Sequence, residues 1–566
     1  MAVVIVTMGS GRYIATRVKD TEAMVLYSHW SLRAWQRNAT LALVMIAAGA
    51  LAFVPTRTAA SELAIAGPLS AKESIQASIA RADTLSEQLV RRQSKSVSQA
   101  LVEYRRRYKR EPPAGYAAWV QFALAHDSPI IDDYDQLEAN LEPFRQLSCK
   151  QIQNVVASSD ARSLAFFGGI KVVDGVVSIY GEAAEHDYRK TMYEILEPLN
   201  HTSGLPDMEL FVNWDDRSKV LPDVKALNGS VDVRFKGFSA ETMGVKHREL
   251  CPTNFIADSE ASRDRPSLDL CRPESDAGML GYFLDAAGLF NGLMPIVSWG
   301  KTSAQADILA PMACYGSAKF RLWKDGFEDT PFEDKLNRIY WRGSPTGFVP
   351  RPKTWRQGHR QKLVRMSQLS KKYQTAVQTG AVLEAARLGS ELDRWFGHVD
   401  HDAIERLPSD MFDMNFSRTS FCNYHNDSAQ ACRELVAELP LVANSPSTDA
   451  YNNRFVFDLD GNTISCRYYA LLESNSLVFK QTGYAEWHDD RMIPWKHYVP
   501  VSLKLEELPE LLDYFANDVQ GQRDAERIAY AGKDWAGRTL RKVDLTVFYY
   551  RLLLEYGHIQ SGCVMP

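Results

Sequence analysis

A short run of alternating strand and helix patterns near the C-terminus constrains the fold most. Residues 454–459, four of which are apolar, have the pattern of a strand and run directly into Asp460-Gly461-Asn462. Residues 465–473 have helical spacing, and the apolar residues 476–479 predict a second strand. Strand, turn, helix and strand in this order are typical of a nucleotide-binding half of an α/β protein.

An earlier segment has the same α/β character. Residues 170–181 predict two short strands around Asp174-Gly175, a dipeptide that favours tight hairpins. After a segment with helical spacing, the compact apolar strand 208–212 ends in Asn213-Trp-Asp-Asp216. Open α/β sheets bind ligands beyond the carboxyl ends of their strands, so Asp215 and Asp216 are candidates for chemistry.

Length and composition indicate a folded body of several units. The chain has 566 residues, and a domain size of about 150 residues suggests two to four units. Hydrophobic residues make up 45% and charged residues 24%, which is close to the globular average and excludes a largely disordered chain. The net charge of −5 gives no general electrostatic reason to bind nucleic acid, so we expect no nucleic-acid partner.

One apolar stretch predicts a membrane anchor. Residues 39–54 carry no charge and are followed by Pro55, and about 17 to 20 apolar residues can span a bilayer. Several basic residues precede the stretch, whereas only Arg57 follows closely, which places the N-terminus in the cytosol. A buried core helix and a cleaved signal peptide are the alternatives. We expect a type II signal anchor in the thin membranes of the Golgi or endoplasmic reticulum.

A helical stalk is expected between the anchor and the body. Residues 70–110 are rich in helix formers, and Pro112-Pro113 then ends the helix. The basic run 105–110 is interpreted as a solvated face, with a lipid or nucleic-acid patch as the alternative. The predicted organisation is a cytosolic tail (1–38), an anchor (39–54), a stalk (55–110), an N-terminal half (111–330) and a C-terminal half with closing helices (331–566).

The cysteines do not define a metal module. Eight cysteines are too few for a disulfide scaffold in a chain of this length, and no CxxC pair is present for structural zinc. If the body is lumenal, Cys251 and Cys271 are candidates for one disulfide that staples a polar insertion.

The first candidate phosphate site follows a predicted strand. Arg342, Gly343, Ser344 and Thr346 stand where a strand passes into a loop. A guanidinium, hydroxyls and a closely approaching glycine backbone can together hold phosphate oxygens. The alternative is an arginine that only stabilises the turn.

The second candidate site follows the strand 454–459. Asp458, Asp460 and Gly461 are followed by Ser465 and Arg467 at a predicted helix start. A cation and free backbone N–H groups at this position can bind an anion. The spacing Asp458-x-Asp460 also fits the loose DxD pattern with which many glycosyltransferases hold a metal and a sugar diphosphate.

Taken together, these segments resemble glycosyltransferase family 90, which includes fungal capsule-associated xylosyltransferases and animal protein O-glucosyltransferases. The likeness spans about residues 100 to 535. The segment 112–116, where the predicted stalk meets the body, and the DLDGN string at 458–462 are closer to the fungal branch. The resemblance implies two Rossmann-like halves in a GT-B-like arrangement, a UDP-sugar held mainly by the C-terminal half, and an inverting reaction. The matching segments are 108–116, 131–135, 207–213, 339–344 and 455–500.

The resemblance also implies roles for the candidate residues. The family's catalytic base matches Asp216, but its usual N-x-x-D-x-P-R surroundings are changed here at Ser218 and Lys219. This departure leaves Asp215 open as an alternative base, and it also leaves altered acceptor choice or weak activity open.

The family's diphosphate-binding arginines match Arg342 and Arg467, with Ser344 and Ser465 close by. Two cations on a departing diphosphate can replace a metal, so no cofactor is required and a divalent cation is only an optional addition. Residues 298–302 and 307–311 match the segment expected near the sugar or acceptor.

We therefore expect a membrane-anchored inverting glycosyltransferase that moves a sugar from a UDP-sugar to a glycan hydroxyl. Xylose is the first expectation for the sugar, and glucose is the second. A protein Ser/Thr transferase is the first alternative. A catalytically inactive, membrane-anchored glycan-binding protein of the same fold is the other.

Overall fold

The computed structural model describes residues 70–561 except 158–163, 165, 182–185, 201, 203, 224, 226–232, 240, 244, 246–248, 250–279, 286, 323–327 and 425, together with 7–8 and 12–13. The chain forms two compact units, Met1–Pro68 and Leu69–Pro566. In the first unit, β1 (Thr7–Met8) pairs antiparallel with β2 (Arg12–Tyr13). The following paragraphs concern the second unit.

The predicted anchor at 39–54 lies outside the described residues, as do Cys251 and Cys271. Among the helices that the structure describes, none is both long and apolar enough to cross a bilayer. The anchor therefore stays a prediction.

The first sheet of the body, called here the N-terminal sheet, has the strand order β10-β8-β5-β3-β4. β10, β8 and β5 run parallel, whereas β3 is antiparallel to both β4 and β5. The predicted hairpin is confirmed, because Asp174 and Gly175 turn between β3 and β4 with φ values of 50° and 75°. The strands are β3 (Phe167–Val173), β4 (Val176–Gly181), β5 (Met208–Asn213), β8 (Ile296–Ser298) and β10 (Ile308–Leu309).

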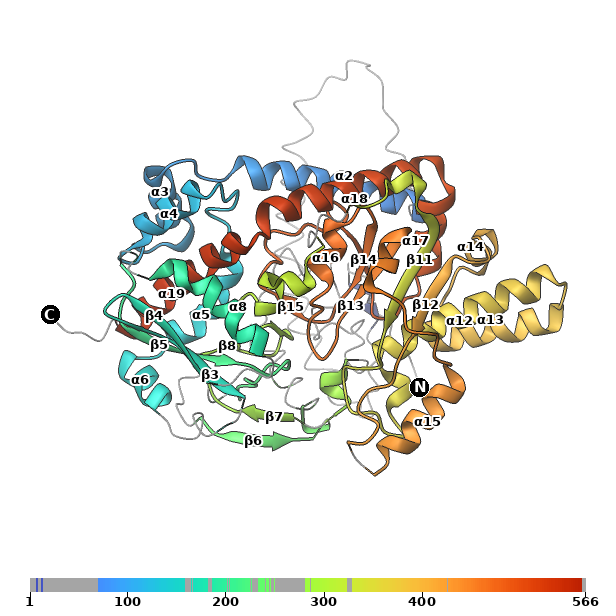
Figure 1. Ribbon diagram of the computed structural model, residues 1–566, viewed down its shortest axis with the longest axis horizontal. Helices are drawn as coiled ribbons and strands as arrows, with labels where there is room; N and C mark the ends of the chain where they lie inside the picture. Colours follow the sequence, from blue (N-terminus) through green and yellow to red (C-terminus); the bar gives the residue numbers. More distant parts are fainter. Residues whose placement is uncertain are drawn as a thin grey trace, which may run out of the picture. The chain divides into compact units, whose positions relative to one another are not determined.

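The last helix, α19 (Lys542–Ser561), packs against helices that accompany this sheet, as Figure 1 shows. Its fully buried Arg551 pairs with Glu555 at 2.9 Å and with Glu138 at 3.2 Å. Nearby arginines lower the pKa of Glu555 to about 2, and this outweighs the effect of burial. The helices in contact with α19 are α4 (Tyr116–Ala125), α5 (Asp135–Arg145), α6 (Cys149–Ala157) and α8 (His186–Leu196).

The second sheet, called the C-terminal sheet, is entirely parallel and has the order β12-β11-β13-β14-β16. In chain order this is 2-1-3-4-5, a doubly wound arrangement whose topological switch point lies between β11 and β13. The body is thus mixed α/β with parallel strands in both sheets, which is compatible with two Rossmann-like halves. The strands are β11 (Leu336–Gly343), β12 (Phe412–Phe416), β13 (Asn453–Leu459), β14 (Leu477–Gln481) and β16 (Val499–Val501).

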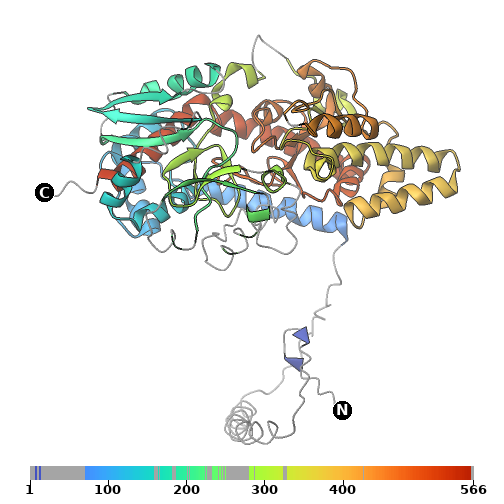
Figure 2. The ribbon, with the colours of Figure 1, turned by 90° about the horizontal axis from the view of Figure 1, so that it is seen from below.

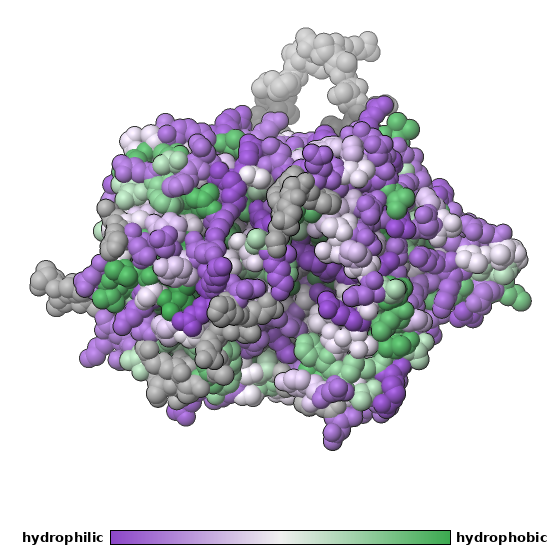
Figure 3. Space-filling view, in the orientation of Figure 1, coloured by the Kyte–Doolittle hydropathy of each residue, from purple (hydrophilic) through white to green (hydrophobic). Residues whose placement is uncertain are grey.

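The strand-helix-strand prediction for this sheet is confirmed by β13, α16 (Tyr468–Glu473) and β14. The helix begins at Tyr468 rather than at Ser465, because the segment before it forms a turn that the Tyr468 N–H closes on the Ser465 carbonyl. Two longer helices, α12 (His359–Gln378) and α13 (Val382–Phe396), form a hairpin that projects from the body in Figures 1 and 2. Figure 3 shows a largely hydrophilic face with scattered hydrophobic side chains.

The described part of the region predicted as a stalk, from residue 70 on, is largely helical and packs along the body. It contains α2 (Ala71–Arg91) and α3 (Val97–Tyr108), and α2 runs beside α18 (Val519–Thr539) in Figure 1. Asp83 of α2 pairs with Arg527 of α18 at 2.8 Å. Two apolar side chains of α2 are buried in the core of the C-terminal sheet, so the helix belongs to the folded body.

Candidate active site

The loop after β5 carries the two predicted acidic residues. Asn213, fully buried at the end of the strand, holds this loop with three hydrogen bonds. Its amide nitrogen donates to the Arg217 carbonyl at 2.8 Å and to Ser298 Oγ at 3.0 Å, and its oxygen accepts the Asp215 N–H at 3.1 Å. The turn thus leaves Asp216 exposed at its tip.

Asp307 fixes the far end of the same loop. Its carboxylate accepts the backbone N–H groups of Lys219 and Val220 at 2.7 and 2.8 Å and the Ser298 hydroxyl at 2.6 Å. Burial raises the pKa of Asp307, and these three donors favour its charged form. Ser298 and Asp307, expected near the sugar or acceptor, are both buried, and they hold the loop through hydrogen bonds.

Asp215 and Asp216 have different surroundings. Asp215 pairs with Lys219 at 2.5 Å, and the ammonium of Lys219 also lies 4.3 Å from the centre of the Phe166 ring. The hydroxyl of Ser218 donates to the Gly300 carbonyl. The two residues that depart from the family pattern therefore both have defined contacts, and one of them engages Asp215.

Asn462 joins the loop of Asp216 to two loops of the C-terminal sheet. Its amide nitrogen donates to Asp216 Oδ2 at 2.9 Å, and its oxygen accepts the Gly347 N–H at 3.2 Å. The Thr463 hydroxyl donates to the Asp216 carbonyl. The loops after β5, β11 and β13 therefore meet at one point, and the last two flank the topological switch point.

A second acidic residue links the same loops. Asp285 Oδ2 accepts the Val349 N–H at 3.3 Å and lies 3.5 Å from Arg217 Nη2. Close packing accompanies this link, because a Cβ on Gly281 would come within 1.8 Å of the Gly347 carbonyl oxygen. The loop after β11 is thus held firmly against the N-terminal part of the body.

Two arginines converge beside the switch point. Arg467 donates to the Arg342 carbonyl at 2.6 Å, and Arg360 donates to the carbonyls of Asp460 and Ser344 at 2.7 and 2.9 Å. Burial lowers the pKa of Arg360 to about 9, with repulsion from Arg467 adding to the effect, and burial also lowers the pKa of Arg467. Two guanidinium groups that repel each other and are largely shielded from water favour a bound anion.

Arg360 is not among the residues that the sequence predicts for the site. It lies at the second position of α12, sixteen residues after Ser344 in the chain, and only the fold brings it back to the loop after β11. One signal was available, because an arginine at the start of a helix that follows a strand and a loop is placed where anions bind.

Arg342 is held differently from the other two arginines. Its guanidinium pairs with Asp413 of β12 at 2.8 Å and lies 4.4 Å from the centre of the Tyr340 ring. Side chains two apart on a strand share a face, so Arg338, Tyr340 and Arg342 line one side of a cavity of about 360 Å³. Gly343 ends β11, and its carbonyl accepts the Ser417 N–H at 3.0 Å.

The DxD carboxylates point into the body. Asp458 pairs with Lys480 at 3.0 Å, and Asp460 accepts the Gly483 N–H at 2.8 Å. Burial raises the pKa of Asp460 to about 8 in spite of the nearby Lys480 charge. Gly461 donates its N–H to the Ile464 carbonyl at 3.1 Å.

Ser465, the remaining predicted donor-site residue, is buried where the turn before α16 begins. For metal binding, the described part of the chain contains no group of three or more His, Cys, Asp or Glu side chains placed to hold an ion.

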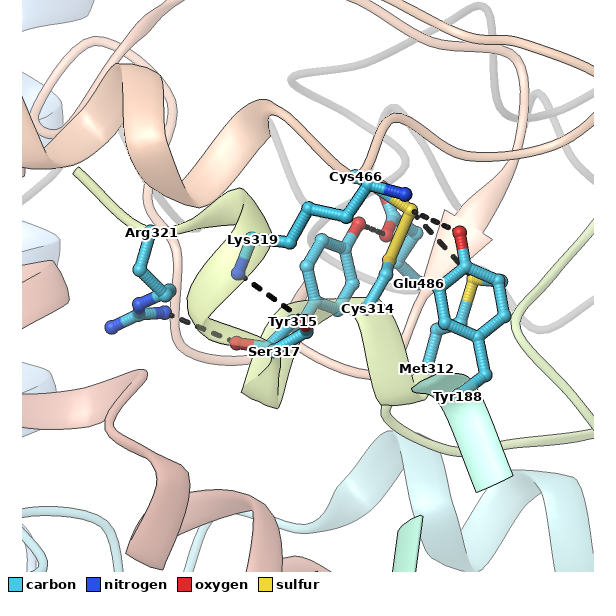
Figure 4. Close-up of a disulfide and its surroundings, with 9 residues drawn as sticks. All are labelled: Tyr188, Met312, Cys314, Tyr315, Ser317, Lys319, Arg321, Cys466 and Glu486. Carbon is cyan, nitrogen blue, oxygen red and sulfur yellow. Dashed lines mark hydrogen bonds between the residues drawn. A yellow bond between two sulfur atoms is a disulfide. The ribbon is translucent and has the colours of Figure 1, made fainter. Parts of the chain in front are cut away.

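A disulfide crosses between the two sheets beside the site. Cys466 is bonded to Cys314 of a short 3-10 turn (Ala313–Gly316), and Figure 4 shows this bond between Tyr315 and Tyr188. The Tyr315 hydroxyl donates to Glu486 in the same view. An antiparallel pair, β9 (Gly300–Lys301) with β15 (Ala485–Glu486), makes a second connection.

Comparison with known proteins relates the chain to one family. Residues 285–564 match the sequence profile of Glycosyl transferase family 90. The chain is 33% identical over 113 residues to protein O-glucosyltransferase 3 of Rattus norvegicus, covering 20% of this chain and 22% of that protein. It is 33% identical over 124 residues to protein O-glucosyltransferase 1 of Homo sapiens, covering 22% of this chain and 31% of that protein.

A third relative is O-glucosyltransferase rumi of Drosophila pseudoobscura pseudoobscura, 33% identical over 119 residues, which cover 20% of this chain and 28% of that protein. The matches thus span between 22% and 31% of the length of these three relatives. Asp215 and Asp216 lie before the region matched by the family profile.

Proposed function

We propose, from the premise that residues 285–564 belong to glycosyl transferase family 90, that this protein moves a sugar from a UDP-sugar to a serine or threonine hydroxyl of a protein. The relatives are named protein O-glucosyltransferases, which supports a protein hydroxyl over the glycan hydroxyl that the sequence placed first. The same names support glucose over xylose as the transferred sugar. The proposed body is GT-B-like, with the donor on the C-terminal sheet.

The contact between Asp216 and Asn462 carries this proposal. It brings an exposed carboxylate of the N-terminal part to the loops at the switch point of the C-terminal sheet. A direct sugar transfer needs a base close to a site that can hold the leaving diphosphate.

In the proposed reaction, the Asp216 carboxylate accepts the proton of the acceptor hydroxyl. The acceptor oxygen forms a bond to the anomeric carbon of the sugar while the bond from that carbon to the diphosphate oxygen breaks. UDP then leaves with the bonding electron pair, and the single displacement inverts the anomeric configuration. General-base catalysis of this kind contributes about 10²- to 10⁴-fold to a rate.

Arg360 and Arg467 are proposed to stabilise the negative charge that grows on the departing UDP. Arg360 is buried and Arg467 is half-buried, and their hydrogen bonds described above go to backbone carbonyls rather than to carboxylates. Fixed cations in a site with little water are effective at this task because they need no reorganisation during the reaction. A divalent cation is an optional addition in this scheme.

The proposed compartment is an oxidising one, the lumen of the Golgi or endoplasmic reticulum. The disulfides Cys314–Cys466 and Cys422–Cys432 support this, since such bonds persist in secretory compartments and are rare in the cytosol.

In the test, the 566-residue chain is incubated separately with UDP-glucose, UDP-xylose, UDP-galactose and UDP-GlcNAc. UDP release is measured with and without a mixture of secretory proteins as acceptors. Release that depends on the protein mixture, with a sugar that alkaline β-elimination removes from the product, supports the proposal. Sugar that resists β-elimination would favour a glycan acceptor. Tight UDP binding without release from any donor would instead favour an inactive glycan-binding protein.

A further inference from the structure

We infer that Asn462 is a positioning residue that holds Asp216 in place against the loop that follows β11. The inference rests on the proposed function, and it gives Asn462 a role in the proposed reaction. It is carried by the two hydrogen bonds of one side-chain amide, to Asp216 at 2.9 Å and from Gly347 at 3.2 Å.

An amide suits this position because it donates and accepts at the same time. Asn462 donates through its NH₂ group to a carboxylate and accepts a backbone N–H through its carbonyl oxygen. An ionised aspartate at this position could accept but not donate, and an alanine could do neither.

The amide is itself held firmly. Asn462 lies in the turn that Gly461 closes onto Ile464, and the neighbouring Thr463 hydroxyl donates to the backbone of Asp216. Gly347 has a φ of 114°, and a Cβ there would lie 3.3 Å from the Gly461 carbonyl oxygen. The two loops therefore pack backbone to backbone, so a shift of the loop after β11 is passed through Asn462 to the carboxylate.

Charge explains why a neutral partner is useful here. The charged groups of the same loop are paired elsewhere, Asp215 with Lys219 and Arg217 with Asp285. A cation in place of Asn462 would stabilise the charged form of Asp216 and weaken it as a base. The neutral amide orients the carboxylate through a hydrogen bond without adding a positive charge of its own.

The test compares Asn462→Ala and Asn462→Asp with wild type in donor hydrolysis, where water replaces the acceptor and UDP release is measured. For Asn462→Ala, the expected result is a kcat lower by about 10- to 100-fold with the donor KM within about twofold, because a misplaced base affects the chemical step. Asn154→Ala and Asn154→Asp, at an exposed site on α6, serve as matched controls and should match wild type.

The pH profile separates positioning from general damage. In Asn462→Asp, the new carboxylate next to Asp216 should raise the pKa of Asp216, so the acid limb of kcat moves to higher pH and activity partly returns there. A loss of kcat with an unmoved acid limb would overturn the inference, and so would wild-type kinetics in both variants.

A titration without turnover keeps the two hypotheses apart. The carboxyl carbon of Asp216 can be followed by NMR in aspartate-labelled protein, with Asp216→Asn identifying the signal. Both Asn462 variants should raise the pKa of Asp216, and an unchanged titration would overturn the inference. If wild type releases UDP from no donor, the proposed function fails, while this titration still decides whether Asn462 holds Asp216.

Discussion

Cys466, the residue directly before Arg467, is disulfide-bonded to Cys314, which lies 152 positions earlier in the chain. One of the two converging arginines is therefore attached covalently, through its neighbour, to the part of the body that carries Asp216. The bond limits how far the two sheets can move apart at the site, since Cα atoms of the two cysteines are 5.7 Å apart.

Removing this bond should lower stability more than removing the other described disulfide. In the chain-entropy description, a bond closing 152 residues contributes about 5 kcal/mol to the free energy of unfolding, and one closing 10 residues about 3 kcal/mol. Cys314→Ser with Cys466→Ser should therefore lower the thermal midpoint more than Cys422→Ser with Cys432→Ser. Calorimetry of the two double variants checks this, and equal midpoints would contradict it.

The three arginines should differ in their effect on UDP affinity. Arg360→Ala and Arg467→Ala should each weaken UDP binding by about 10- to 100-fold, the loss expected for a charge-assisted hydrogen bond. Arg342→Ala should have a smaller effect, because its guanidinium is paired with Asp413. Titration calorimetry with UDP decides the order, and a loss in Arg342→Ala as large as in Arg467→Ala would contradict this assignment.

Asp460 should make stability depend on pH. Burial raises its pKa to about 8, whereas an unfolded chain has an aspartate pKa near 4. The folded state therefore binds the proton more tightly than the unfolded chain does. The contribution of this proton to the free energy of unfolding is full below about pH 4 and is lost as the pH rises to about 8.

Asp460→Asn stays neutral at every pH and keeps the oxygen that accepts the Gly483 N–H. Relative to this variant, wild type should lose thermal stability between pH 5 and pH 8, as differential scanning fluorimetry can measure. If the difference in thermal midpoint between wild type and Asp460→Asn stays constant across this range, or changes in the opposite direction, Asp460 is charged in the folded protein.

Chelation should have little effect on UDP release. The DxD carboxylates are already engaged by Lys480 and by the Gly483 N–H, and Arg360 with Arg467 can stabilise the leaving group. We expect at least about half of the rate to remain in EDTA. A loss of about tenfold or more that Mn²⁺ reverses would assign the stabilisation to a metal.

Local patterns predicted the elements that are set by local physics. Asp174-Gly175 predicts a hairpin turn and forms one, because the turn requires two consecutive residues in the left-handed conformation. The strand 454–459 and the acidic loop after 208–212 also lie where the sequence predicts them, because the buried apolar residues within each segment identify the strand.

Contacts between distant segments could not be predicted in this way. The pairing of Arg342 with Asp413 joins residues 71 positions apart, and no spacing rule connects them. The approach of Arg360 to Ser344 and the disulfide between Cys314 and Cys466 likewise appear only when the sheets are assembled. The packing of α2 onto α18 has the same origin, because an isolated amphipathic pattern does not say which surface will cover it.

The central claim is that Asp216, and not its neighbour Asp215, is the base of the proposed transfer. The most direct measurement is the kcat of UDP release for Asp216→Asn and Asp215→Asn, two isosteric changes at adjacent positions of one loop. We expect Asp216→Asn to lower kcat by about 10²- to 10⁴-fold and Asp215→Asn to lower it by less than about tenfold. An equal loss in both variants, or a larger loss in Asp215→Asn, would contradict the account.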